Sequence, residues 1–401
     1  MAPDATTPAA TPPTPAPSAA PTAAPTPVAE PVAEPEVRAV WVHLFDHTLK
    51  TPQSVDRMLD RVARANLNTV IVEVVRRQDA YYDSDVLVRS PDPALAPGFD
   101  LLDHVTAGAH ERGLQIQAWY PTITAYHHAY DDLAHPAGWI WTEHGREAPE
   151  DQRWVTRLHD GTWDDHLDPG LPEVREHVAA VAAELAAHAG LDAIHLDYVR
   201  YPDRDTGYHP RALARFRQET GRTGTPAPQD PAWSEWRREQ VRLMVEGIVE
   251  AVHAVAPDLP VTAAVIAQGE GPVPGQRSFT ATSAYARYHQ DWVGWLHSGL
   301  LDAVMPMNYF DAQAHPDWFD QWASFERQLI GELDALLVGG MAGYLNHPED
   351  SLAQIEQLRR HLDGVALYSF QQTARDEPYD RLFDLLVQQV WPGRAAVPPW
   401  R

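Results

Sequence analysis

One apolar stretch ends in residues that could do chemistry. The segment AIHLDYVRYP, residues 193–202, begins as a buried strand and then brings Asp197, Arg200 and Tyr201 in quick succession. A strand buried on both faces is normally a continuous apolar run, so a carboxylate and a guanidinium at its C-terminal end need a reason. Catalysis by Asp197 is one interpretation. A structural cap, or an ion pair with Arg200, is the other.

Two further acids could act together with Asp197. Cleavage of a glycosidic bond requires one carboxylic acid to protonate the leaving oxygen and usually a second carboxylate to attack or to activate water. Glu73 lies in the apolar run VIVEVV, where its alternative role is to neutralise Arg76 or Arg77. Glu270 lies in the glycine-rich run QGEGPVPG, where its alternative is that of a solvated loop acid. Both residues remain candidates for the second catalytic carboxylate.

Aromatic and polar side chains gather at the predicted ends of other strands. Sugar rings stack on aromatic rings and their hydroxyl groups need hydrogen-bonding partners, so this mixture predicts a carbohydrate site. Trp119 and Tyr120 are adjacent in one strand, and only one of the two can point into the interior. The predicted substrate contacts at strand ends are Trp119, Tyr120, Arg200, Tyr201, Asn308, Tyr309 and Tyr344.

The 20 histidines form no recognisable metal motif. His43 and His47 flank Asp46, and His127 and His128 are adjacent, but neither pair has the helical spacing of a zinc motif such as HExxH. We therefore expect no metal and no cofactor. A metal-dependent deacetylase or amidohydrolase is kept as an alternative that only the number of histidines suggests.

A repeated unit of strand and helix must position these residues. Apolar runs bounded by turn signals predict eight strands, at residues 37–45, 68–75, 114–122, 191–201, 260–266, 301–309, 335–344 and 364–371. Segments with apolar residues three or four apart predict the helices between them, at residues 54–65, 101–112, 172–189, 233–255, 291–298, 318–333, 351–362 and 379–391. Strict alternation implies a parallel sheet with right-handed crossovers. The predicted fold is α/β, a single-domain (β/α)8 TIM barrel.

Long loops are expected at one face of this barrel. The segments 125–168 and 203–231 are too long for simple connections. In TIM barrels such loops, and the active site, lie at the C-terminal ends of the strands. The second segment includes a further predicted helix, residues 210–220, which we expect over the mouth of the barrel. Gly113 and Gly190 follow predicted helices and should adopt left-handed backbone angles.

Composition divides the 401-residue chain into two parts. Residues 1–35 are nearly all Pro, Ala, Thr and Glu, which predicts a disordered tether, and residues 36–395 form the barrel. The absence of cysteine excludes disulfides and thiolate chemistry. The sequence contains no run of eighteen apolar residues, so it predicts no transmembrane segment. The net charge of −25 argues against nucleic acid as a partner and favours a neutral or cationic polymer.

The tether also bears on localisation. Pro/Thr/Ala-rich segments are typical of proteins held away from a cell envelope. No hydrophobic signal region precedes this one. We expect a secreted or envelope-tethered protein whose signal or anchor is absent from this chain. The alternative is a cytosolic protein with a disordered tail.

Several motifs, in order along the chain, resemble the glycosyl-hydrolase-like 10 family. They are RAVWVHL, NTVIVEVVRRQDAYYDSD, GFDLLDHVTAGAHERGLQIQAWY, LDPGLPEVREHV, LDAIHLDYVRYP, WRREQV and LLDAVMPMNYF. The resemblance implies a (β/α)8 barrel acting on envelope or extracellular polysaccharide, including peptidoglycan glycan strands stripped of their peptides. It implies roles for Asp197 and Trp119 in the site and for Arg238 and Glu239 at its edge. Tyr198 stands where the family commonly has a second acid.

Together these observations predict a glycoside hydrolase that acts on a polysaccharide or oligosaccharide by carboxylate acid/base catalysis. Asp197 is the central carboxylate, with Glu270 or Glu73 as its partner. A polysaccharide-binding barrel without catalytic activity is the main alternative.

Overall fold

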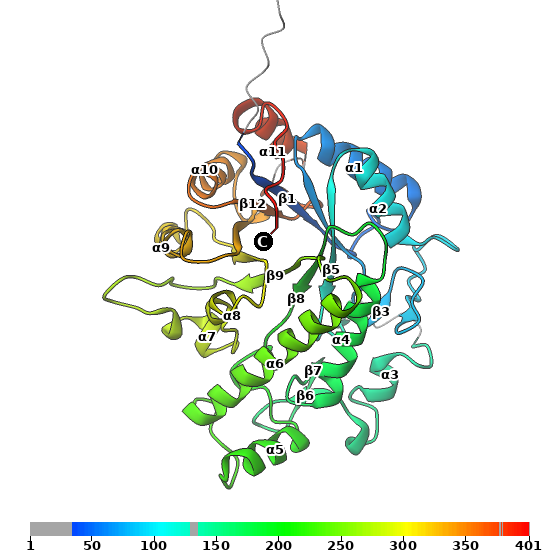
Figure 1. Cartoon of the computed structure of the whole chain (residues 1–401), viewed down its shortest axis with the longest axis vertical. Coiled ribbons are helices and arrows are strands. Elements are labelled where there is room, and N and C mark those ends of the chain that lie inside the picture. Colours follow the sequence, from blue (N-terminus) through cyan, green and yellow to red (C-terminus); the bar gives the residue numbers. More distant parts are fainter. Residues whose placement is uncertain (1–33, 129–134, 377, 379, 401) are drawn as a thin grey trace, which may run out of the picture. The chain divides into compact units, whose positions relative to one another are not determined.

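The computed structural model describes residues 34–128, 135–376, 378 and 380–400 (Figure 1). The predicted tether lies outside the described residues, except for Glu34 and Pro35. No helix in the described part of the chain is long and apolar enough to cross a lipid bilayer.

Eight parallel strands close into a barrel in the described part of the chain (Figure 1). They are β1 (Val37–Val42), β2 (Thr69–Glu73), β5 (Gln115–Pro121), β8 (Ala193–Asp197), β9 (Val261–Ile266), β10 (Ala303–Asn308), β11 (Leu336–Ala342) and β12 (Gly364–Tyr368). The ring is closed because β1 pairs with both β2 and β12. The predicted (β/α)8 barrel is confirmed, although seven of these strands end one to four residues earlier than predicted because the chain turns into loops at the rim.

A helix follows each barrel strand and covers its outer face. These helices are α1 (Pro52–Arg64), α2 (Leu101–Glu111), α4 (Pro172–Ala186), α6 (Pro231–Val255), α8 (Trp292–His297), α9 (Pro316–Leu329), α10 (Pro348–Arg359) and α11 (Asp380–Leu385). Four of them begin two or three residues before their predicted starts, at Pro52, Pro231, Pro316 and Pro348. Proline fits the first helical turn, where its missing N–H has no acceptor to lose.

The structure also confirms the two predicted glycine turns. Gly113 and Gly190 have φ angles of 68° and 92° after α2 and α4. This left-handed region carries little penalty for glycine. Each turn directs the chain from a helix into the next strand, so both strands start at the same end of the barrel.

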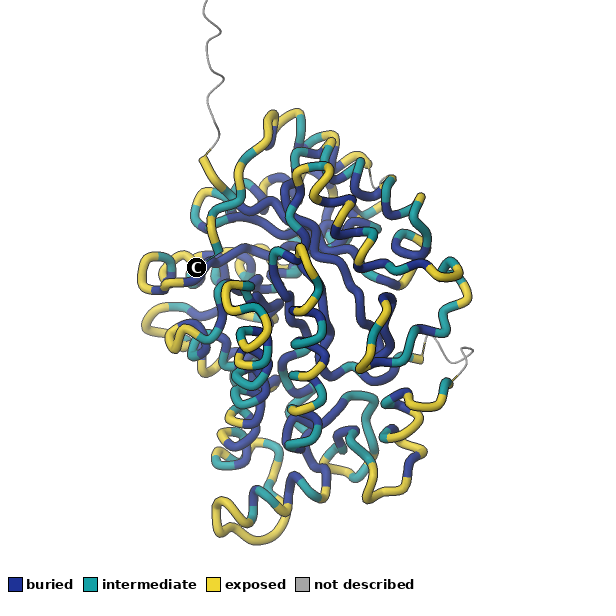
Figure 2. Tube along the Cα trace, turned by 45° about the vertical axis from the view of Figure 1, so that its right-hand side comes forward, coloured by how far each residue is buried: buried dark blue, intermediate teal, exposed yellow. Residues whose placement is uncertain are grey.

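The core consists of two clusters of buried residues, one inside the barrel and one between the strands and the helices. Figure 2 shows buried residues along the strands and exposed residues on the outer turns. Alternate strand residues point into the barrel, where Trp41, Ile71, Trp119 and Met305 pack together. The intervening residues pack against the helices. This alternation follows from the two-residue period of a strand.

Shorter elements occupy the loops. They are β3 (Asp79–Ala80), β4 (Val88–Arg89), α3 (Ile140–His144), η2 (Glu150–Gln152), β6 (Val155–Arg157), β7 (Trp163–Leu167), α5 (Pro210–Thr220), η3 (Phe279–Ala281), α7 (Ser283–Ala286), η4 (Gly343–Leu345) and the π-helical turn η5 (Leu386–Val390). The helix expected at residues 210–220 is α5, but it does not cover the mouth. Phe216 of α5 packs on Trp233 and Trp236 of α6, with ring centroids 4.9 and 6.0 Å apart, so α5 lies beside α6.

The N-terminal ends of the strands are closed by the chain's own C-terminal segment. Glu36 N–H donates to the carbonyl of Ala396 over 3.1 Å, and Trp400 Nε1–H donates to Gln115 Oε1 over 3.1 Å. Trp400 also packs against the residues inside the barrel. The opposite rim, where the strands end, is therefore the one that can hold a substrate.

A buried arginine anchors the long loop after β8. Arg237 is fully buried on α6, and its guanidinium donates to the carbonyl oxygens of Arg204, Thr206 and Pro228 over 2.5, 2.7 and 2.8 Å. These three bonds tie widely spaced points of the loop to one helix. The neighbouring Arg238 is only half-buried and pairs with Glu235.

We predict that Arg237→Ala lowers the free energy of unfolding by about 3 kcal/mol, because it leaves buried carbonyl oxygens without donors. The matched variant Arg238→Ala should cost about 1 kcal/mol or less, because its ion pair is at the surface. Urea unfolding followed by tryptophan fluorescence measures both. Equal losses in the two variants would show that the loop does not depend on Arg237.

Candidate active site

A cavity of about 300 Å³ opens at the C-terminal ends of the strands. Its walls include two carboxylates, Glu73 and Asp197, together with arginines and a majority of aromatic or apolar side chains. It therefore combines the two kinds of group that a carbohydrate site requires, flat apolar faces and polar groups that can hydrogen-bond.

The two carboxylates come from strands on either side of β5. Strand pairing places Glu73 opposite Trp119, and Pro121 opposite Asp197. Partners in a parallel register point to the same side of the sheet, so Glu73, Trp119 and Asp197 all face the interior. Trp119 Nε1–H donates to Asp197 Oδ2 over 3.2 Å, which orients this carboxylate.

Glu73 is held by an ion pair and by the backbone. Its Oε2 accepts from Arg76 Nη1 over 2.6 Å and from the N–H of Leu44 over 2.7 Å. Burial raises the pKa of Glu73, and the charge of Arg76 and the bond from Leu44 act in the opposite direction. The charge of Asp197 also raises the pKa of Glu73, so protonation of one carboxyl depends on the other.

Asp197 ends β8 at a sharp turn. The next residue, Tyr198, has a φ of 54°, which is uncommon for a residue with a side chain and redirects the chain immediately after the carboxylate. The N–H of Tyr198 donates to Asp197 Oδ1 over 2.6 Å. Burial raises the pKa of Asp197, opposed by the charge of Arg200 and by the bonds from Tyr198 and Trp119.

A chain of hydrogen bonds forms the floor below the carboxylates. Trp41 Nε1–H donates to His195 Nε2 over 3.0 Å, His195 Nδ1 lies 2.8 Å from Thr262 Oγ1, and Thr262 Oγ1 donates to Gln117 Oε1 over 2.9 Å. The directions require His195 to carry its proton on Nδ1. Burial lowers the pKa of His195 to about 3, so this histidine is neutral and structural.

Tyrosines and one phenylalanine make up much of the wall. Tyr309 and Tyr368 stack with ring centroids 5.3 Å apart, and Tyr344 meets Tyr368 edge-on at 6.1 Å. Burial raises the pKa of each of these hydroxyls, so all three are neutral hydrogen-bonding groups at physiological pH. Phe45 is 48% exposed at the mouth of the cavity, and the guanidinium of Arg76 lies over its ring.

Comparison with known proteins agrees with this architecture. Residues 36–349 match the family described as glycosyl hydrolase-like 10. The chain belongs to this family. The family and the fold together support a glycosidase-type function acting on carbohydrate.

Curated relatives in the glycosyl hydrolase-like 10 comparison are distant. The chain is 26% identical over 367 residues to glycosyl hydrolase YngK of Bacillus subtilis, covering 82% of this chain and 66% of the relative. It is 21% identical over 300 residues to glycosyl hydrolase DigH of Escherichia coli K12, covering 71% of this chain and 64% of the relative. This chain thus spans slightly less than two thirds of each relative's length.

Solved structures share the fold of this family member. The glycoside hydrolase domain of PgaB (BpsB) from Bordetella bronchiseptica superposes with a TM-score of 0.59 at 17% identity, covering 88% of this chain and 99% of that one. The catalytic domain of β-amylase from Paenibacillus polymyxa gives 0.61 at 12% identity, covering 90% and 100%. At these identities the likeness shows the barrel fold alone.

The cavity of the family member brings together half of the predicted site. The predicted residues that line it are Glu73, Trp119, Asp197, Arg200, Tyr309 and Tyr344. Residues that were not predicted as site residues also line it, among them Trp41, Phe45 and Tyr368. The inward-facing position of Trp41 in β1 could have revealed it. Phe45 lies in the loop after the strand, where side chains no longer alternate between the two sides of a sheet.

Two predicted contacts face outward because of the strand period. Tyr120 follows the inward-facing Trp119, and its hydroxyl donates to Gln78 Oε1 over 3.3 Å. Asn308 points toward α9, where its Nδ2 donates to Glu326 Oε2 over 3.0 Å. Neither side chain lines the cavity.

Four more predicted residues lie away from the cavity. Glu270 is exposed and pairs with Arg277 in its loop. Tyr201 is fully buried, and its hydroxyl donates to Asp168 Oδ1 over 3.2 Å. Arg238 and Glu239 form ion pairs along the surface of α6, with Glu235 and Arg242 respectively. The buried arginine of this helix is Arg237, which was not among the predicted site residues.

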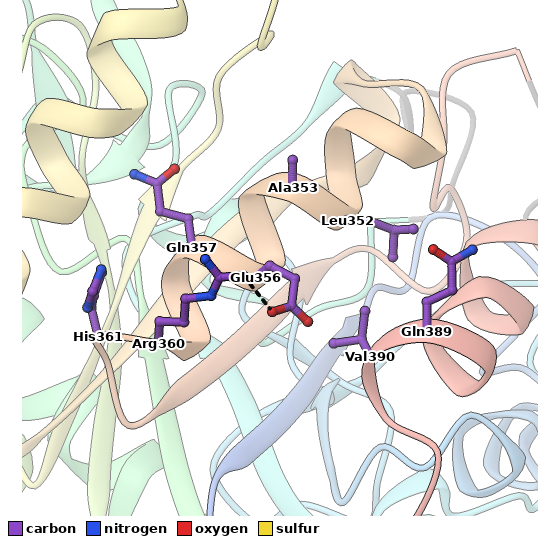
Figure 3. Close-up of a pocket in the computed structure, with 8 residues that line it drawn as sticks. All are labelled: Leu352, Ala353, Glu356, Gln357, Arg360, His361, Gln389 and Val390. Carbon is purple, nitrogen blue, oxygen red and sulfur yellow. Dashed lines mark hydrogen bonds and ion pairs between the residues drawn. The ribbon is translucent and has the colours of Figure 1, made fainter.

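A second hollow, of about 720 Å³, lies between α10 and η5 (Figure 3). The one carboxylate drawn there, Glu356, accepts from Arg360 Nη2 over 3.4 Å and from Arg359 Nη1 over 3.3 Å. The eight residues that line it include no Trp, Tyr or Phe. It therefore lacks both the paired acids and the flat rings of the rim cavity. Among the described residues, no group of three or more His, Asp or Glu side chains is arranged to hold a metal ion.

The buried Asn308–Glu326 pair should make the stability of the protein depend on pH. Glu326 is fully buried, and burial raises its pKa to about 8. A folded-state pKa above the unfolded value means that the protein is most stable below about pH 4.5 with respect to this group and loses that stability as the pH rises through 8. Glu326→Gln should remove this loss. The free energy of unfolding of the variant, relative to that of the wild type, should therefore rise by about 4 kcal/mol between pH 5 and 9.

Unfolding by urea at a series of pH values measures the difference. The control is Glu250→Gln, which makes the same substitution on the exposed face of α6. A constant difference for Glu326→Gln would mean that Glu326 stays ionised in the fold.

Proposed function

We propose that the protein is a glycoside hydrolase that cleaves O-glycosyl bonds within an envelope or extracellular polysaccharide, with Glu73 and Asp197 as its catalytic pair. The observation that carries the proposal is the placement of two buried carboxylates on either side of Trp119, in a cavity walled by aromatic rings. Acid-assisted glycosidic cleavage needs two such groups facing one bond.

The surroundings of the two acids favour different roles. Glu73 pairs with Arg76 at 2.6 Å, which stabilises its ionised form. Burial raises the pKa of both acids, but Asp197 forms no ion pair within 4.0 Å among the described residues. We assign proton donation to Asp197, while Glu73 supplies the negative charge that attacks or activates water.

The substrate we propose is a glycan chain, with peptidoglycan strands freed of their peptides as the first to be tested. Support comes from membership of the glycosyl hydrolase-like 10 family, from the family resemblance of the sequence motifs and from the tyrosines, whose neutral hydroxyls can bond to sugar hydroxyls. A secreted or envelope-tethered location, proposed from the Pro/Ala/Thr-rich residues 1–35, would place the protein beside such a polymer.

One observation favours a second candidate. Tyr198 follows Asp197 where a second acid is common in the family, so a polysaccharide-binding barrel without catalytic activity is the alternative function. Release of new reducing ends from peptide-free glycan strands separates cleavage from binding.

Asp197→Asn and Glu73→Gln should each lower kcat by about 10²-fold to 10⁴-fold, because each removes a group that exchanges a proton or carries charge. The fold should be retained, because the amide has nearly the same shape as the carboxylate. Reducing-end formation measures turnover, and circular dichroism measures folding. Glu270→Gln is the matched control and should leave kcat unchanged, since Glu270 pairs with Arg277 outside the cavity. Full activity of the Asp197 variant would refute the assignment.

Arg76→Gln should move the acidic limb of the pH profile of kcat/KM to higher pH. The Arg76 charge lowers the pKa of Glu73, so its removal raises that pKa and Glu73 loses its charge earlier on acidification. The matched variant Arg277→Gln should leave the profile in place. An unmoved acidic limb in Arg76→Gln would show that Glu73 need not be ionised.

A further inference from the structure

Arg200 stands in the cavity wall with its hydrogen-bonding capacity unused. It lines the same cavity as Asp197 and Glu73. Within the described residues, its guanidinium donates no hydrogen bond and forms no ion pair, and its buried Nε has no partner. A buried or half-buried guanidinium normally satisfies its donors, so this side chain has donors available for a ligand.

Aromatic rings fix the position of this guanidinium. Its central carbon lies 4.2 Å from the ring centroid of Tyr198 and 5.3 Å from that of Tyr288. Tyr198 is itself stacked on His166, with centroids 5.5 Å apart. Contacts with ring faces orient a guanidinium without consuming its N–H groups.

The other two arginines of the cavity are already engaged. Arg76 pairs with Glu73 at 2.6 Å, and Arg77 pairs with Asp79 at 2.8 Å. The nearby acid does not take up Arg200 either, because Asp197 accepts from Trp119 and from the Tyr198 backbone instead. A positive charge with free donors therefore lies beside the proposed proton donor.

We propose that Arg200 forms an anion subsite that recognises a carboxylate carried by a sugar unit next to the bond that is cleaved. This inference rests on the proposed function and adds a substrate class to it, namely acidic glycans. A planar guanidinium can bind both oxygens of a carboxylate at once. The carboxylate belongs either to a uronic acid or to an acidic ether substituent such as a lactyl group.

The subsite is tested by binding, independently of turnover. In the Asp197→Asn background, calorimetry compares peptide-free peptidoglycan strands with the same strands after chemical reduction of their carboxyl groups to alcohols. A second pair, oligoglucuronate and its carboxyl-reduced form, distinguishes a uronic acid from a lactyl group. For at least one pair, we expect the native glycan to bind about 10-fold to 100-fold more tightly.

Adding Arg200→Gln should abolish this preference by weakening binding of the native glycan alone, and Arg200→Lys should retain part of it. The matched control is Arg287→Gln, which removes a charge next to Tyr288 from a residue that pairs with Asp203. It should keep the preference. Equal binding of native and reduced glycans in both pairs overturns the subsite, as does a preference that survives in Arg200→Gln.

The two proposals fail separately. A chain that cleaves native and reduced glycans equally well is a hydrolase without the subsite. A chain that releases no reducing ends but loses its carboxylate preference in Arg200→Gln has the subsite without the proposed activity. Because the comparison of the two glycans needs no substitution at Arg200, it remains decisive even if that variant does not fold.

Discussion

The two-residue period of strands in a closed barrel decides which side chains can meet at its rim. The pairing of β2 with β5 and of β5 with β8 places Glu73, Trp119 and Asp197 on the same side of the sheet, so all three point into the barrel. The same rule turns Tyr120 and Asn308 outward, onto helix-side partners. A shift of one residue in any of these strands would exchange the two sets. The polar site is thus a consequence of the packing that fills the barrel.

Burying two acids in one cavity is unfavourable, and the surrounding structure offsets it unequally. Glu73 receives an ion pair and a backbone N–H, whereas Asp197 receives an indole N–H and a backbone N–H. Burial nevertheless raises both pKa values. Unequal support of this kind can keep one carboxyl protonated while the other is charged, which is what acid/base chemistry between two carboxylates requires.

The sequence could predict the barrel, and half of the residues that were proposed for the candidate site line its cavity, for different physical reasons. Strand and helix periods are local, so the strands and helices were predicted to within a few residues. Rim residues within a strand follow the same period, and Trp119 over Tyr120 could have been chosen from it. Loop residues follow no period. Glu270 pairs with Arg277 in its own loop, and Tyr201 lies beyond the turn at Tyr198 and packs on Asp168. Such partners are distant in sequence or set by turn geometry.

Net charge does not by itself determine what the cavity can accept. The value of −25 favours a neutral or cationic polymer at long range, but exposed charges farther apart than about 10 Å are screened at ordinary ionic strength. Inside a partly enclosed cavity, the nearest charges dominate. Three arginines line the rim cavity, and the acids Glu73 and Asp79 engage two of them. For the anionic glycan proposed above, the acidic surface would slow the approach, while Arg200 and its ring contacts would hold the carboxylate.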